Sequence, residues 1–254
     1  MNKQAIVKAF SRCARLYDDY ADIQKQAAEE LAGWIHTDGF RRILEIGCGT
    51  GNYTLRLKNK FEYSGLLAVD ISQEMIEVAR NKLQGREVEF VTADAENFSF
   101  PGEFNLITSN ACFQWFVDLE KAFLEYEKML TPGGWIIFSI FGPRTFFELN
   151  DALAACLKDK SIPAAAFLPR DKIAGILNRN FNGIEIREEI YRETFPCLRD
   201  LLRKIKYTGI RGEAVNSKAI LGPKSLKKIE EAYLDMHKQI RATYQVFFCK
   251  GVKK

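Results

Sequence analysis

The chain has 254 residues, 47% of them hydrophobic, which is enough apolar material for one sizeable core. Its formal net charge of +4 does not by itself indicate nucleic-acid binding, and two histidines argue against a histidine metal site or a Ser-His-Asp triad, so no metal is predicted. The six cysteines form no C-x-x-C pair, and neither a signal peptide nor an apolar run of about 18 residues is present, so we expect a cytoplasmic protein with no membrane partner.

The N-terminal region predicts two helices. Residues 3–17 have apolar side chains at helical spacing, and a second helix is expected over residues 22–36. One interpretation is a helical hairpin packed on the domain. The other is an arm that covers a bound ligand, with Tyr17 or Tyr20 beside it. The two are compatible, because a packed arm can also act as a lid.

A glycine-rich turn follows the first predicted strand, Ile43–Ile46. Gly47, Gly49 and Gly51 occupy every second position, which allows a sharp turn and close approach of a ligand. The helix that follows is expected to point its free N–H groups at that ligand. The spacing differs from the G-x-G-x-x-G of dinucleotide binders. Counted from Glu45, the loop reads E-x-G-x-G-x-G directly after a strand. This resembles the motif of class I methyltransferases that use S-adenosylmethionine. The alternative is a tight turn that binds no ligand.

Acidic residues follow the next two predicted strands. Asp70 ends the strand over residues 64–70, where an acid in a doubly wound sheet accepts hydrogen bonds from ribose hydroxyls. Alternatively, Asp70 or Ser72 only caps the helix over residues 73–83. Asp94 follows a strand over residues 87–91 and suits a contact with the adenine edge, or it is simply a solvated loop residue.

The fourth strand, residues 104–110, is expected to end facing the transferable methyl group. It lacks the Asn/Asp-Pro-Pro-Tyr sequence of amino-methylating nucleic-acid enzymes. Gln114 and Trp115 are candidates for the acceptor pocket, although Trp115 suits a core position equally well. A helix over residues 118–130, a turn over 130–134 and a buried strand over 135–141 follow.

Strands alternate with helices over residues 40–141, which predicts a Rossmann-like α/β fold with a mostly parallel sheet. A sixth strand is expected within residues 184–195 and an antiparallel seventh over 243–250. The prediction is one methyltransferase domain, residues 1–254, with four parts. They are a helical lid (1–36), the cofactor-binding core (40–141), helical insertions on the substrate and partner side (142–240) and the last strand (242–250).

Residues 199–228 hold nine Lys and Arg side chains against two acids. A solvated helical face is the usual outcome for such a run. The alternative is a docking surface for an acidic partner, where positive charge raises the association rate.

Further residues carry a more specific resemblance that spans nearly the whole chain. They are Phe10, Ala14-Arg15-Leu16-Tyr17-Asp18, Ala21, Gln24, Gln114-Trp115, Phe141–Leu149 and Ala242–Val246. This set resembles the malonyl-acyl-carrier-protein O-methyltransferases of biotin synthesis. The resemblance implies S-adenosylmethionine as cofactor and the free carboxyl of malonyl-acyl-carrier protein as acceptor, with malonyl-coenzyme A left open. The expected cofactor-binding residues are Tyr17, Glu45, Gly47, Gly49, Gly51, Asp70, Ile71, Asp94, Ala95 and Asn110.

Methylation of a carboxylate needs no general base, because a carboxyl group with a pKa of about 4 is already ionised at neutral pH. Catalysis then depends on positioning and desolvation. Arg144 is the candidate cation that orients the carboxylate, with Gln114 and Trp115 shaping the pocket; alternatively, Arg144 only begins a surface helix. Rival functions are methylation of another carboxylic acid or a hydroxyl, and a cofactor-binding module without catalysis. A nucleic-acid substrate ranks behind both.

Overall fold

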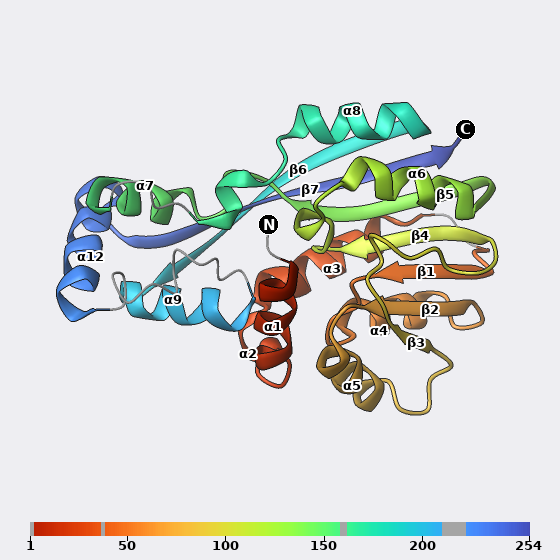
Figure 1. The fold of residues 1–254 in the computed structure, drawn as a ribbon, viewed down its shortest axis with the longest axis horizontal. Coiled ribbons are helices and arrows are strands. Elements are labelled where there is room, and N and C mark those ends of the chain that lie inside the picture. Colours follow the sequence, from red (N-terminus) through yellow and green to blue (C-terminus); the bar gives the residue numbers. More distant parts are fainter. Residues whose placement is uncertain (1–2, 37–38, 158–161, 210–221) are drawn as a thin grey trace.

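The computed structural model describes residues 3–36, 39–157, 162–209 and 222–254. Within these residues one sheet contains seven strands in the order β3-β2-β1-β4-β5-β7-β6 (Figure 1). The strands are β1 (Arg42–Ile46), β2 (Gly65–Asp70), β3 (Glu89–Thr92), β4 (Phe104–Asn110), β5 (Leu130–Phe141), β6 (Phe181–Phe195) and β7 (Ile240–Lys253). Strands β1 to β5 pair in parallel, and β7 runs antiparallel to β5 and β6. The predicted fold class is confirmed.

Strand β5 differs from its prediction. The segment expected to be a turn is part of the strand, since Leu130 pairs with Phe104 and regular pairing resumes at Trp135 after a break in register. Gly133 has a φ of +72° in this irregular part. A bulge inserts extra residues without ending a strand, so turn-forming residues do not always mark a strand end.

The helices lie on both faces of the sheet. They are α1 (Lys3–Cys13), α2 (Tyr17–Tyr20), α3 (Asp22–Trp34), α4 (Asn52–Lys60), α5 (Gln73–Lys82), α6 (Leu119–Met129), α7 (Phe147–Cys156), α8 (Arg170–Asn180), α9 (Leu198–Tyr207) and α12 (Pro223–His237), with short 3-10 turns η1 (Phe113–Trp115) and η2 (Pro163–Ala166). One apolar layer includes Leu31 of α3 and Leu57 of α4, and the other includes Phe123 of α6 and Ile173 of α8. Alternating strands and helices thus bury two hydrophobic faces.

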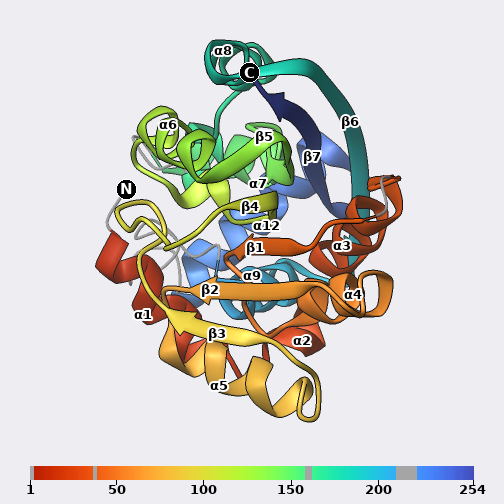
Figure 2. The ribbon, with the colours of Figure 1, turned by 90° about the vertical axis from the view of Figure 1, so that its right-hand side faces the viewer.

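The strands β6 and β7 are long and extend beyond the parallel core. At their far end lie α7, α9 and α12, while α1 and α2 lie between that end and the core (Figure 1). Figure 2 shows α5 beyond β3 and α8 at the opposite edge. The N-terminal helices therefore contact both halves, with α1 against α5 and α9, and α2 against α9. In the described part of the chain, no helix combines the length and apolar character needed to cross a membrane.

Candidate cofactor and acceptor site

A cavity opens at the carboxyl ends of β1, β2 and β4. The space it encloses is about 760 Å³ when the open mouth is included. Nine predicted site residues line it: Tyr17, Gly47, Gly49, Asp70, Ile71, Asp94, Ala95, Asn110 and Trp115. Helix α1 supplies a further wall through Lys3, Ile6, Val7 and Phe10. The core and the N-terminal arm (residues 3–34) therefore enclose one space.

The glycine loop shapes the floor of this cavity. Gly47 has a φ of +71°, and a Cβ there would overlap the side chain of Cys112. Gly49 has a φ of +54° and open space where its Cβ would lie. Gly51 packs instead against Ala79 of α5 and Leu83 directly after that helix, and it is not a lining residue. The loop thus combines a backbone conformation that favours glycine with room for a ligand.

The amides of the loop are used inside the protein. The N–H groups of Gly47 and Cys48 both donate to Val69 O, at 2.7 and 2.9 Å. Gly49 N–H donates to Asp70 Oδ2 at 2.9 Å, and Gly51 N–H donates to Cys48 O at 2.9 Å. The first three of these donors hold the loop onto β2. The expectation for the N–H groups at the start of the following helix concerns other residues and stays a prediction.

Of the two candidates for the cap of α5, Ser72 is the residue that accepts from the helix, and the ribose contact of Asp70 stays a prediction. Ser72 Oγ caps α5 by accepting from Met75 N–H at 3.2 Å. Asp70 lines the cavity while its two oxygens accept from the N–H groups of Gly49 and Ser72, each at 2.9 Å. Burial raises the pKa of Asp70, and these hydrogen bonds oppose the increase. Each oxygen keeps acceptor capacity for a ligand hydroxyl.

Asp94 is paired by the N-terminal arm. Lys3 Nζ lies 2.6 and 2.7 Å from its two carboxylate oxygens and 2.6 Å from Glu96 Oε2. Asn97 Nδ2 donates to Asp94 Oδ2 at 2.9 Å. Although burial opposes it, these contacts lower the pKa of Asp94. The residue is therefore an anionic acceptor at the rim of the cavity, with α1 attached to it.

A second, smaller space of about 340 Å³ lies at the N-terminus of α4. It is lined by Tyr17, Gln24, Gly47, Cys48, Gly49, Thr50, Asn52, Tyr53 and Asn110. Tyr17, Gly47, Gly49 and Asn110 line both spaces, so the two are neighbours. Tyr20, the alternative to Tyr17, instead stacks on Tyr207 of α9 with ring centroids 4.6 Å apart.

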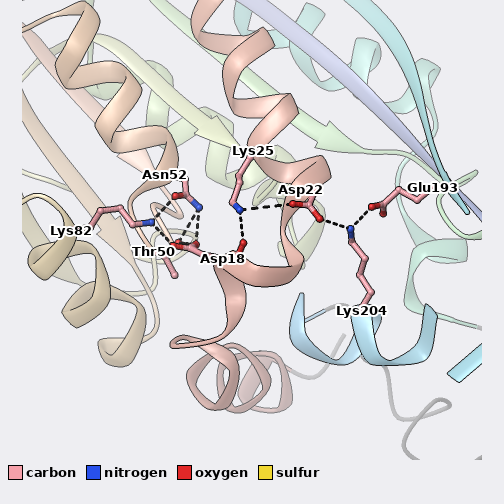
Figure 3. Close-up of polar contacts among 8 residues, drawn as sticks. All are labelled: Asp18, Asp22, Lys25, Thr50, Asn52, Lys82, Glu193 and Lys204. Carbon is pink, nitrogen blue, oxygen red and sulfur yellow. Dashed lines mark hydrogen bonds and ion pairs between the residues drawn. The ribbon is translucent and has the colours of Figure 1, made fainter. Parts of the chain in front are cut away.

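Two carboxylates anchor the arm on either side (Figure 3). Asp18 accepts from Thr50 Oγ1 at 2.6 Å, from Asn52 Nδ2 at 2.8 Å and from Lys82 Nζ at 2.6 Å. Burial opposes these contacts, but together they lower the pKa of Asp18. This anchor fastens the arm to the end of the glycine loop and to α5.

The second anchor faces the insertion. Asp22 Oδ2 lies 3.0 Å from Lys204 Nζ, which also pairs with Glu193 (Figure 3). Lys204 is 5% exposed, so this cation is almost completely removed from solvent. Asp18 and Asp22 thus attach one short stretch of chain to two different parts of the molecule.

Three other predicted residues lie outside the cavity lining. Glu45 is buried beneath the loop; burial raises its pKa to about 8, the Thr54 hydroxyl opposes this, and the charge of Asp70 adds to it. Gln114 is buried and bridges the backbone, donating to Ala111 O at 2.6 Å and accepting from Phe141 N–H at 3.4 Å. Arg144 is exposed, and its guanidinium lies 6.0 Å from the centre of the Phe147 ring.

Trp115 belongs both to the cavity wall and to the apolar core. It lines the cavity and also packs edge-on against Phe10 and Phe167, with ring centroids 5.8 and 5.4 Å away. Its role in an acceptor pocket stays a prediction.

The basic stretch is only partly an exposed surface. Arg199, Arg203 and Lys206 are exposed along α9, whereas Lys204 is buried in the second anchor. Arg211 and Lys218 lie outside the described residues.

Several site residues were not predicted as such. Lys3 belongs to a helix that was recognised only by its apolar spacing, and Phe10, Asp18 and Gln24 were named only as part of the resemblance. Their contacts reach residues far away in the chain, such as Lys82, and no local pattern indicates them. Among the described residues, no group of three His, Cys, Asp or Glu side chains is arranged to hold a metal ion.

Comparisons with known proteins agree with this geometry. Residues 44–138 match the model of a methyltransferase domain family. Over 92% of the chain, it is 33% identical to malonyl-acyl-carrier-protein O-methyltransferase 2 of Ilyobacter polytropus, covering 90% of that protein. The corresponding enzyme of Brevibacillus brevis is 34% identical over 99% of the chain and 97% of its own length. Among solved structures, the YcgJ protein of Bacillus subtilis superposes with a TM-score of 0.64 at 17% identity, covering 90% of this chain and 98% of that one.

Proposed function

This chain belongs to the malonyl-acyl-carrier-protein O-methyltransferase family, and from that membership we propose that it methylates the free carboxylate of malonyl-acyl-carrier protein. The methyl donor is S-adenosylmethionine, and the product is the malonyl methyl ester of biotin synthesis. The observation that supports this best is the cavity between the glycine loop and the N-terminal arm, because it places polar acceptors beside an apolar wall.

The residues present fit the cofactor. Asp70 offers carboxylate oxygens to ribose hydroxyls, and Asp94 offers them to the amine of adenine. Gly49 has open space above its Cα, where a side chain would obstruct a nucleoside. Ile71 and Ala95 line the cavity beside the two acids. When bound, the cofactor supplies an electrophilic methyl group on a sulfonium.

The protein's contribution is to orient and desolvate an acceptor that is already ionised. The carboxyl group of a malonyl thioester carries its negative charge at neutral pH, so no side chain has to remove a proton. Phe10, Trp115 and Phe116 line the cavity and exclude water from it. Holding the methyl donor and the carboxylate in the right geometry lowers the activation free energy by up to about 7–11 kcal/mol.

Arg144 remains our candidate for orienting the malonyl carboxylate. It follows β5, and its backbone N–H donates to Gln245 Oε1 at 3.0 Å, which fixes the start of the segment. Its exposed guanidinium has a planar fork suited to carboxylate. Arg144→Ala should raise KM for the malonyl substrate while S-adenosylhomocysteine affinity stays unchanged. Equal effects on both would remove the proposal.

The exposed basic side chains of α9 are our candidate docking surface for the acidic carrier protein. Arg199, Arg203 and Lys206 are four and three residues apart and therefore share one face of the helix. Reversing Arg203 and Lys206 to Glu should slow turnover of malonyl-acyl-carrier protein and spare malonyl-coenzyme A. Parallel losses would assign these side chains a structural role. In this proposal the N-terminal arm acts as the lid over the cavity, and the helical insertions of residues 142–240 contact the carrier protein.

The decisive experiment incubates the protein with malonyl-acyl-carrier protein and isotopically labelled S-adenosylmethionine. Mass analysis of the phosphopantetheine arm should show one labelled methyl group on the malonyl carboxyl. Labelling of a different carboxylic acid or a hydroxyl would favour the rival methyltransferase functions. Cofactor binding without transfer to any acceptor would favour a non-catalytic module.

A further inference from the structure

Lys204 is a buried cation that joins three elements of the fold. Its Nζ lies 3.0 Å from Asp22 Oδ2, at the start of α3, and it also pairs with Glu193 of β6 (Figure 3). Tyr244 of β7 donates its hydroxyl to the other carboxylate oxygen of Glu193 at 2.7 Å. A buried cation is unfavourable unless it is paired, so Lys204 ties α9 to the N-terminal arm and to the sheet.

Two further contacts join the arm to α9 and to the residues directly after it. The ring of Tyr20 in α2 stacks on that of Tyr207 in α9, with centroids 4.6 Å apart and an interplanar angle of 23°. Gly209 packs so closely against the Phe10 ring of α1 that a Cβ there would lie 2.3 Å from Phe10 Cε1. All three helices of the arm therefore contact this one segment.

The arm also forms part of the cavity wall. Phe10 and Tyr17 line the main cavity, and Phe10 packs edge-on against Trp115, another lining residue, with ring centroids 5.8 Å apart. Direct contacts thus lead from Gly209 through Phe10 to Trp115. A displacement of α1 and α2 would change the cavity wall and the contacts of α9 together.

Helix α9 presents different side chains to the arm and to solvent. Lys204 and Tyr207 contact the arm, whereas the basic side chains proposed above for docking are exposed. If α1 and α2 open, the cavity loses two wall residues and α9 loses its stacking partner. A nucleoside in the cavity and a protein docked on α9 should therefore both favour the closed position. Two ligands that favour the same state strengthen each other's binding.

We propose that Tyr20, Asp22 and Lys204 couple the two sites, so that an acidic carrier protein docked on α9 holds α1 and α2 closed and strengthens nucleoside binding. This inference rests on the proposed function, because it takes α9 as the docking surface. Asp22 and Lys204 do not line the cavity and act as positioning residues. By reciprocity, the nucleoside strengthens carrier-protein binding by the same factor.

The test measures S-adenosylhomocysteine affinity by calorimetry, with and without saturating acyl-carrier protein that lacks its phosphopantetheine group. This form has no group that reaches into the cavity, so any effect on the nucleoside passes through the enzyme. The wild type should bind S-adenosylhomocysteine about fivefold or more tightly when the carrier protein is present. In the double variant Tyr20→Ala, Asp22→Ala this ratio should fall below about twofold.

Two further variants sharpen the comparison. Asp22→Glu keeps a carboxylate beside Lys204 and should keep the wild-type ratio. Asp19→Ala is the matched control, because it removes an exposed acid of α2 and should also keep the ratio. If the double variant does not fold, Asp22→Ala alone replaces it, since the side chain of Asp22 is 53% exposed, and it should lower the ratio.

A wild type that binds both ligands with a ratio near one would overturn the inference and leave the proposed function intact. A folded double variant that keeps the wild-type ratio would also overturn it. A merely structural role predicts this second result, because it lowers both S-adenosylhomocysteine affinities equally. A wild type that binds neither ligand would refute the proposed function, and the inference with it.

Discussion

The glycine loop and the N-terminal arm face each other across the cavity, and they contribute in opposite ways. In the loop, the amides of Gly47, Cys48 and Gly49 are all satisfied by β2. The arm brings side chains that line the cavity, among them Phe10 and Tyr17. The loop therefore sets the shape of the site, and the arm supplies part of its chemistry.

The two regions also differ in how firmly they are held. The loop connects a central strand to a core helix, whereas the arm is held by contacts such as Lys3–Asp94 and Asp18–Lys82, whose side chains are 23–35% exposed. Partly exposed ion pairs each stabilise by about 1 kcal/mol or less. We therefore expect α1 and α2 to open at a lower free energy than α3, whose Ala28 and Leu31 belong to the buried core.

The largest effect should come from filling the loop. Gly47→Ala combines a positive φ with overlap against Cys112, and we expect a loss of about 2–5 kcal/mol in the free energy of unfolding. Gly49→Ala adds a methyl group to open space, so it should destabilise by only about 1 kcal/mol while weakening S-adenosylhomocysteine binding more. Denaturant unfolding and calorimetry measure the two quantities. If both variants lost stability equally, the loop would not have the separate packing and ligand-facing positions described above.

A second effect concerns Glu45, whose pKa is raised to about 8 by burial. The folded protein then holds a proton that the unfolded chain releases near pH 4.5. The contribution of Glu45 to the free energy of unfolding is therefore most favourable below its unfolded pKa, and it declines as the pH rises to about 8. Glu45→Gln should remove this decline and, at about 1.4 kcal/mol per pKa unit, increase the free energy of unfolding at pH 8 by up to about 4 kcal/mol. Parallel stability–pH curves for wild type and variant would contradict this explanation.

The smallest effect should come from the arm. Asp18→Asn weakens its contacts with Thr50, Asn52 and Lys82, and we expect a loss of about 1 kcal/mol after solvent screening. Hydrogen exchange should rise in the arm and not in β1 or β4. Because the pKa of Asp18 is lowered, its contribution is present above its unfolded pKa and lost as pH falls through the folded value.

Asp19→Asn is the matched control, since Asp19 is exposed on the same short helix. It should leave both stability and exchange unchanged. A similar effect from both variants would show that the net charge of the arm matters and that the anchor does not.

The difference between local and distant contacts also explains which parts of the fold and of the site could be predicted from the sequence. Strand β4, Phe104–Asn110, was predicted with its observed bounds, since periodicity and flanking loops are local signals. The destination of the loop amides was not, because it depends on Val69, more than twenty residues away. The anchor between Asp18 and Lys82 spans 64 residues and depends on how the arm folds back. Local patterns thus indicate the strands and the acids, and tertiary contacts decide which groups are free.

We expect the cofactor to lie between the glycine loop and the N-terminal arm. A crystal structure with S-adenosylhomocysteine would locate it. Adenosine should lie beside Gly49, Asp70 and Asp94, and the N-terminal arm should contact the ligand. A nucleoside bound anywhere else, or one that leaves the arm without contact, would contradict it.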